Sequence, residues 1–334
     1  MKKLFFLLTF ICFACHEASK RGNISIVPVN LAEINSAFDD YNSNSPIFME
    51  SLSLFFSTNR KTSGSNFDIV HHPLDIISSY KTGKVTVEEY NVTNGYHDKV
   101  SDALYRMNTD SDELGPYIWS EGTKANATDD KYGYNGYNVY LFLYSSNEGG
   151  NQDIKFLHNL DDESYSSPIS ISFLNSPQDD AYPSLTTDSS ALYFCSSRKG
   201  GFDIYKATLN KNISVRQNLE DTSPKDIVEV SLLSSSADDK CPLILDNIMV
   251  FVSNRPGGFG GFDLYYSIFK NGDWAAPVNF GDKINTEFDE YRPFIKPMGK
   301  DFDNDFMIFS SNRPGGKGGF DLYYVGVPKS EDFH

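Results

Sequence analysis

The chain has 334 residues, of which 40% are hydrophobic and 14% aromatic, and its formal net charge is −16. Nucleic-acid phosphates are bound mainly by Lys and Arg, so this charge excludes nucleic-acid binding as the main function. The 20 Tyr and 26 Phe residues favour the half-buried, pleated surfaces of strands, and the composition therefore predicts an all-β fold.

Residues 1–14 have the pattern of a secretory signal peptide. A basic start precedes the run LFFLLTFICFA, which is too short to span a bilayer. The run ends in Phe13-Ala14-Cys15, which resembles the lipobox of bacterial lipoproteins, although Cys12 stands where Leu is usual. The resemblance implies that Cys15 is lipidated and that residues 15–22 form a tether. The alternative is cleavage after Ala14 without lipidation.

A repeated motif organises residues 23–327. The run SNRPGGFGGFDLYYS at residues 253–267 returns as SNRPGGKGGFDLYYV at residues 311–325, and weaker copies lie upstream. Self-similarity at a spacing of about 50 to 60 residues indicates a repeat architecture. Each copy contains an aspartate at the start of a strand: Asp68, Asp153, Asp203, Asp263 and Asp321.

Each repeat has the same internal order. An acidic pair opens it, and a short strand, a strongly apolar strand such as IMVFVSN, a glycine-rich turn and a third strand such as FDLYY follow. A more variable fourth strand closes the unit. Four short antiparallel strands per unit of this length predict a propeller blade.

The two ends of the repeat region predict how the ring closes. The last unit stops at its third strand, FDLYYVGV, and residues 328–334 are a tail. The first unit has a spare strand before it, NISIVPVNL at residues 23–31, and pairing the two would remove two sheet edges. The sequence therefore predicts a five-bladed propeller closed by an N-terminal strand. The alternative, a sixth blade within residues 76–110, lacks a glycine turn, and YHDKVSDALYRM in this region suits a short helix.

The acidic pairs, the Ser-Asn-Arg strand ends, the Gly-Gly turns and the Phe-Asp-Leu/Ile-Tyr strands resemble the WD40-like repeats of TolB-type propellers. The resemblance covers residues 23–327 and implies a binding platform in the Gram-negative cell envelope. It implies an outer-membrane lipoprotein that acts as a monomer and binds an envelope protein or a peptide.

One carboxylate of each acidic pair is a candidate for a ring at the mouth of the central channel. Converging carboxylates would suit a hard cation such as calcium, or attract a basic peptide. The alternative is that these residues cap turns between blades. The candidates are Asp40, Glu113, Asp180, Asp239 and Glu290.

Arginines and aspartates bracket the glycine turn in four repeats. We expect each arginine to reach across its hairpin to the aspartate and fix the turn, which makes these residues structural. The expected pairs are Arg60 with Asp68, Arg198 with Asp203, Arg255 with Asp263, and Arg313 with Asp321.

Cys195 and Cys241 lie on strands of neighbouring repeats, and strand geometry favours two separate buried thiols over a disulfide.

The sequence thus favours a non-catalytic, lipid-anchored scaffold for protein or peptide binding. The alternative is a surface lipoprotein that binds or degrades polysaccharide. Blade-specific carboxylates in a pocket would indicate an enzyme, and exposed tyrosines in the polar segment 121–138, such as Tyr132, Tyr134 and Tyr137, would indicate glycan binding.

Overall fold

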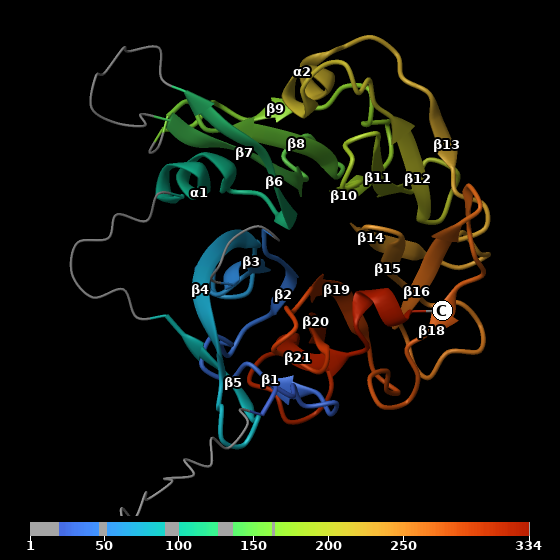
Figure 1. The fold of residues 1–334 in the computed structure, drawn as a ribbon. Helices are drawn as coiled ribbons and strands as arrows, with labels where there is room; N and C mark the ends of the chain where they lie inside the picture. Colours follow the sequence, from blue (N-terminus) through green and yellow to red (C-terminus); the bar gives the residue numbers. More distant parts are fainter. Residues whose placement is uncertain (1–19, 47–51, 91–99, 126–135, 162–163, 334) are drawn as a thin grey trace, which may run out of the picture.

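Five antiparallel sheets surround a central channel in the computed structural model, which describes residues 20–46, 52–90, 100–125, 136–161 and 164–333 (Figure 1). Each sheet begins with an inner strand at the channel, and the next two strands follow outwards in sequence order. The predicted all-β, five-bladed propeller is confirmed.

The first three blades contain four strands each. Blade 1 consists of β2 (Asp40–Asn44), β3 (Leu52–Thr58), β4 (Asp68–Ser78) and β5 (Val85–Glu89). Blade 2 consists of β6 (Glu113–Ala125), β7 (Gly136–Ser146), β8 (Asp153–His158) and β9 (Ile169–Ser170). Blade 3 consists of β10 (Asp180–Leu185), β11 (Ala191–Ser196), β12 (Asp203–Thr208) and β13 (Ile227–Glu229).

The last two blades differ at their outer edges. Blade 4 has β14 (Asp239–Leu245), β15 (Ile248–Ser253) and β16 (Asp263–Lys270), and two short strands, β17 (Asp273–Trp274) and β18 (Val278–Asn279), both pair with β16. Blade 5 has β19 (Glu290–Lys296), β20 (Asp305–Ser311), β21 (Asp321–Val327) and, from the other end of the chain, β1 (Val29–Asn30).

The ring closes as predicted, because β1 pairs antiparallel with β21, with Val29 opposite Tyr324 and Asn30 opposite Tyr323. The closing strand is shorter than the expected residues 23–31. Pro28 precedes it and has no N–H to donate to a ladder. Residues before Pro28 are joined by isolated bridges instead, at Gly22 with Phe302 and Asn23 with Lys84.

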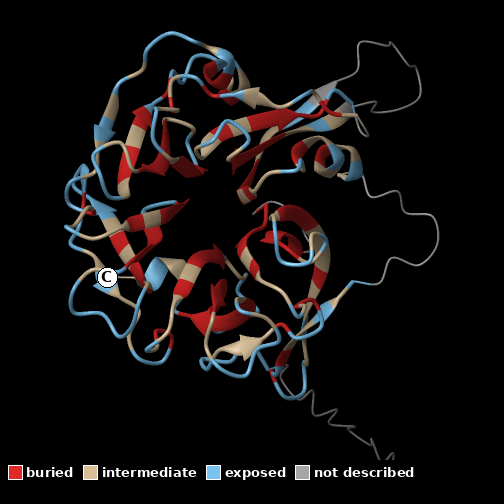
Figure 2. Cartoon of the chain, turned by 180° about the vertical axis from the view of Figure 1, so that it is seen from behind, coloured by how far each residue is buried: buried red, intermediate tan, exposed pale blue. Residues whose placement is uncertain are grey.

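The second strand of each blade is the core of the sheet, as its apolar sequence predicts. Every residue of β3, β11, β15 and β20 is buried, because both faces of these strands are covered by neighbouring blades. Figure 2 shows this distribution, with buried residues on the inner strands and exposed ones in the peripheral loops.

Helices are short and lie between strands: α1 (Ser101–Met107) connects blades 1 and 2, α2 (Val215–Glu220) lies between β12 and β13, and a 3-10 turn, η1 (Ser330–Asp332), follows β21. The described part of residues 76–110 holds the end of β4, β5 and α1, so it is not a sixth blade. No helix among the described residues is long and apolar enough to cross a membrane.

The ends of the 121–138 segment belong to a long hairpin, because Ala125 pairs with Gly136. Its centre, with Tyr132 and Tyr134, lies outside the described residues, and so does Cys15.

Candidate ligand site at the channel mouth

The five carboxylates predicted to ring the channel mouth do not face an open channel. Each begins an inner strand and is 0% exposed. Each accepts a hydrogen bond from the backbone N–H four residues earlier, and these donors are Ser36, Thr109, Ser176, Ser235 and Thr286. The carboxylates therefore fix the turn that leads into their own blade.

The arginines pair with these buried carboxylates and not with the aspartates across the hairpin. Arg60, Arg198, Arg255 and Arg313 contact Asp40, Asp180, Asp239 and Glu290 at 2.5–2.8 Å. The reason is the ladder register, which places each carboxylate beside the Ser or Thr that ends the second strand. The arginine two residues later donates to that hydroxyl and so reaches the inner strand. The expected pairing was therefore wrong in its acidic partner.

In blades 4 and 5 the aspartate of the third strand holds the glycine turn through backbone groups. Asp263 accepts from the N–H groups of Phe259 and Gly260, and Asp321 accepts from those of Lys317 and Gly318. Among the described residues, only the blade 1 aspartate at this position forms an ion pair, with Lys61 Nζ 3.8 Å from Asp68.

The other acid of each pair joins neighbouring blades. Its Oδ1 accepts a backbone N–H from the previous blade at 2.8–3.0 Å, and the contact from Phe320 to Asp39 joins the last blade to the first. All of the acidic-pair side chains are thus used within the fold. Within the described residues no group of three or more His, Cys, Asp or Glu side chains is placed to hold a metal ion.

A different set of side chains fills the channel. In every inner strand the residue two positions after the buried carboxylate has a positive φ: Asn42, Gly115, Tyr182, Cys241 and Arg292, with φ between 42° and 61°. A β-bulge in the same stretch shifts the register of each inner strand. We call these five residues the plug.

The plug residues contact one another across the channel. Arg292 Nη2 donates to the carbonyls of Gly115 (3.2 Å) and Pro116 (2.9 Å), and its guanidinium lies 5.1 Å from the Tyr182 ring centroid. Gly115 is the residue that makes room, since a Cβ there would lie 2.4 Å from Tyr182 Cδ1. The plug therefore blocks the channel between its two mouths.

Cys241 belongs to the plug and Cys195 lies on the adjacent strand of blade 3. Both are buried and unbridged, as predicted. Burial raises the pKa of both thiols, that of Cys195 to about 12, so neither is a reactive thiolate at neutral pH.

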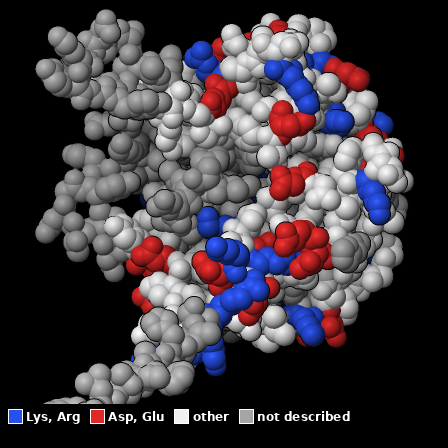
Figure 3. Space-filling view, in the orientation of Figure 1, with Lys and Arg blue, Asp and Glu red and all other residues white. Residues whose placement is uncertain are grey.

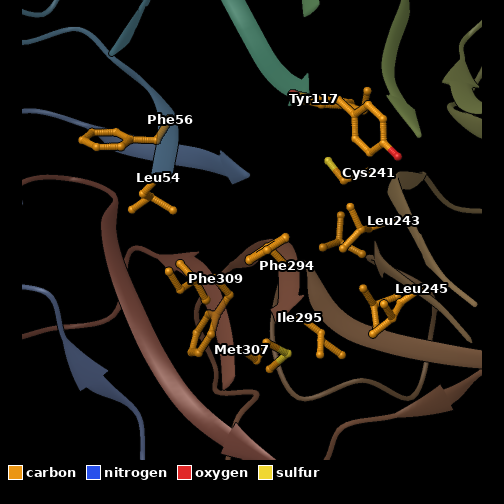
Figure 4. Close-up of a cluster of buried hydrophobic side chains, with 14 of the residues drawn as sticks. Leu54, Phe56, Tyr117, Cys241, Leu243, Leu245, Phe294, Ile295, Met307 and Phe309 are labelled. Carbon is orange, nitrogen blue, oxygen red and sulfur yellow. The ribbon is translucent and has the colours of Figure 1, made fainter. Parts of the chain in front are cut away.

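A cavity of about 240 Å³ lies where the inner strands end, one layer beyond the plug. Its lining includes the residues four positions after the buried carboxylates in four blades, namely Asn44, Tyr117, Leu243 and Phe294. Figure 4 shows Tyr117, Leu243 and Phe294 approaching one another from separate blades, with Cys241 of the plug beside them.

The cavity combines aromatic surfaces with a few polar groups. Tyr117, Trp119 and Phe294 provide the aromatic surfaces. Asn44, Ser45, Ser120, Thr187 and Asp246 supply the polar groups. Burial raises the pKa of Tyr117 to about 12, so its phenol stays neutral.

A second cavity, also about 240 Å³, shares Thr187, Ile244 and Asp246 with the first and continues outwards over blades 3 and 4. Tyr193, Phe269 and Trp274 line it together with Asp188 and Lys206. We call the first the inner cavity and the second the outer cavity.

The sequence signal for this site is the variation inside the repeat. Offsets two and four after each buried carboxylate differ between blades, whereas the residue between them is Pro in four of the five. A residue that varies within an otherwise symmetric repeat is a candidate for function. The acidic pairs attracted the prediction because they recur, and recurrence in every blade instead reflects a structural role.

No family model and no curated protein matches the sequence. Solved structures with a similar fold include a thermostable family-43 glycoside hydrolase, at 10% identity and TM-score 0.52, with 91% of each chain covered. Another is a family 117 glycoside hydrolase produced by the marine bacterium Zobellia galactanivorans, at 11% identity and TM-score 0.50, with 93% of this chain and 92% of the other covered. TolB from Acinetobacter baumannii has 15% identity and TM-score 0.35, and the match covers 79% of this chain and 65% of TolB.

The protein-binding scaffold expected from the sequence is corrected by these comparisons and by the buried carboxylates. At such identities the likeness shows the fold, and the chains that share it are glycoside hydrolases in the cases with the higher scores. The carboxylate ring on which the protein-binding scaffold depended is also buried. The protein-binding scaffold is therefore wrong as the first interpretation.

Proposed function

We propose that this protein binds a carbohydrate chain at the channel mouth, in the inner and outer cavities. The observation that carries the proposal is the convergence of three aromatic side chains and several polar groups from all five blades on one cavity. Ligand sites in proteins have this composition, with a mostly apolar lining and a few polar groups that fix orientation.

A sugar ring fits this lining because it has two kinds of surface. Its C–H faces are apolar and pack on aromatic rings, whereas its hydroxyl groups require hydrogen-bond partners. Trp119 is only half-buried and offers a face for packing, and Asn44, Ser120 and Asp246 offer donors and acceptors at the edge.

The ligand is longer than one sugar. The inner and outer cavities meet at Thr187 and Asp246, whose side chains are hydrogen-bonded to each other at 3.1 Å. A chain crossing this junction would have one sugar against Trp119 and another against Trp274 or Phe269.

The carboxylates present support binding more than hydrolysis. Glycosidases usually need two carboxyl groups, about 5 to 10 Å apart, one of which donates a proton. The carboxylates among the described lining residues are Asp246 and Asp188. Lys211 donates to Asp188 and holds the pKa of that carboxyl well below its usual range, so Asp188 has no proton to donate at neutral pH.

The test is binding of the purified chain to an oligosaccharide panel, followed by titration calorimetry on the best ligand. Trp119→Ala should weaken binding at least about fivefold, because aromatic packing contributes about 1 kcal/mol or more. Tyr105→Ala is the matched control, since Tyr105 is 83% exposed on α1, away from the cavities.

Two results would count against the proposal: no binding to any panel member, or equal losses in the two variants. The ligand is also incubated with the wild type and with Asp246→Asn. Reducing-end release that disappears in the variant would make the protein a hydrolase acting at the same site.

For localisation we propose lipidation of Cys15 and attachment to the outer membrane, supported by the lipobox-like run before Cys15. Cells expressing the chain with an alkyne-tagged fatty acid should label the wild type and not Cys15→Ser. Equal labelling of both would contradict the proposal.

A further inference from the structure

Arg292 is a buried cation in the plug, and no anion of the described residues balances it. It is 4% exposed, and it sits in the third position of β19 at φ 42°. Two carbonyls satisfy its Nη2, but Nη1 is buried and has no hydrogen-bond partner in the described part of the chain. No carboxylate of the described residues forms an ion pair with this guanidinium, in contrast to the four turn arginines.

An uncompensated charge in this position is costly. Arginine remains protonated in proteins, so it cannot avoid the cost by losing its proton. Burial lowers the pKa of Arg292, and the surrounding groups are thiols and phenols that are neutral at pH 7. A water molecule could satisfy Nη1, but only an anion can balance the charge.

Arg292 does not itself line the inner cavity, but residues close to it along the strands do. Phe294, two residues further along β19, lines that cavity, and so does Tyr117, two residues beyond the Gly115 carbonyl that Arg292 contacts. On the other side of the channel, the Asn42 Oδ1 and the hydroxyls of Ser43 and Ser45 are also buried without partners, and Ser45 lines the cavity. Of these unsatisfied groups Ser45 lines the cavity, and Asn42 and Arg292 each lie two positions before a lining residue of the same strand.

We infer that the carbohydrate proposed above is an acidic one, and that Arg292 recognises its carboxylate or sulfate group at the inner end of the cavity. This inference rests on the proposed function and specifies its ligand. The guanidinium suits both groups because it offers directed, charged donors to their oxygens.

The acidic surface determines how such a ligand is recognised. With a net charge of −16 the chain repels a polyanion at long range, and on the face shown in Figure 3 the basic side chains lie among acidic ones. Recognition therefore depends on one buried contact, which salt screens far less than surface charge. The preference for the acidic ligand should persist at 0.5 M salt, whereas non-specific charge attraction would disappear.

The experiment compares pairs of oligosaccharides that differ only in charge. Galacturonate and alginate oligomers are titrated against their methyl esters, and sulfated carrageenan oligomers against their desulfated forms. The full-length wild type should prefer one acidic member by about tenfold to a hundredfold. Arg292→Gln keeps a donor for the Gly115 and Pro116 carbonyls and should lose that preference, while binding of the neutral member is retained. The comparison of acids with esters and that of sulfated with desulfated oligomers together identify which group Arg292 recognises.

Two further variants distinguish a loss of recognition from a folding defect. Arg292→Lys keeps the charge and should keep part of the preference, and Arg216→Gln, at an exposed arginine, should keep all of it. If Arg292→Gln does not fold, the wild type's acid-to-ester preference in 0.5 M salt decides alone. Equal binding of acid and ester by the wild type would overturn the inference, and so would a preference that survives in Arg292→Gln. If neutral glycans bind and no acidic one is preferred, the proposed function stands without the inference. If nothing binds, both fail.

Discussion

Replacing Arg255 by Met tests whether the arginine and inner-strand carboxylate pairs hold the blades. Asp239 is fully buried and Arg255 Nη2 lies 2.5 Å from its Oδ1, while Met would preserve packing against Phe251 and Tyr265. Removing one partner of a buried pair costs about 3 kcal/mol. With an unfolding entropy of about 2.1 cal/mol/K per residue, 334 residues give about 0.7 kcal/mol/K, so the melting temperature should fall by about 4 °C.

Calorimetric melting of two further variants separates this effect from the loss of any arginine. Arg216→Met breaks an exposed pair with Glu220 (3.9 Å) and should change the free energy of unfolding by less than about 0.5 kcal/mol. The double variant Arg255→Met with Asp239→Asn removes the carboxylate charge that Arg255 no longer balances, and it should recover part of the lost melting temperature. The reasoning is refuted if Arg255→Met melts no lower than Arg216→Met.

Three other perturbations test the rest of the fold. Burial raises the pKa of Glu113, so folding favours its protonated form and the free energy of unfolding falls as the pH rises above 4.5. Glu113→Gln should flatten that fall when melting temperatures are measured over a pH series. An unchanged slope would contradict this prediction. Deleting residues 20–31 removes β1 and leaves the edge of β21 unpaired, and an unpaired edge can pair with another chain. Size-exclusion chromatography should therefore show self-association. A variant that stays monomeric would disprove this prediction. Gly115→Ala and Gly122→Ala both place Ala at a positive φ, but only the Cβ at position 115 would meet other side chains. Gly115→Ala should therefore have the lower melting temperature. Equal melting temperatures of the two variants would argue against the packed plug.

The fold could be predicted from the sequence because its information is local and repeated. The acidic pair, the apolar second strand and the glycine turn recur in each unit, so a weak copy such as that of blade 2 is identified by the strong ones. The closure of the ring could also be predicted from the repeat, because the first unit has a spare strand before it and the last unit lacks one. The structure confirms it, since β1 pairs with β21.

The partners of individual side chains were predicted less well. An arginine two residues beyond a strand end can reach the strand on either side, and only the ladder register places Asp239 beside Ser253. The sequence likewise marks an acidic pair without telling whether its carboxylates face water, and in the folded chain they are buried and already hydrogen-bonded.

By itself, then, the sequence determined the strands, their order and the closed five-fold ring, because hydrophobic periodicity and turn chemistry act between residues close together in the chain. The tertiary structure alone decided what meets at the centre. Asn42, Tyr182 and Arg292 come from three different blades, and their shared position in the repeat does not tell that their side chains lie close together. They meet because five bulged inner strands converge on one axis, and the same convergence places Trp119 and Asp246 around one cavity.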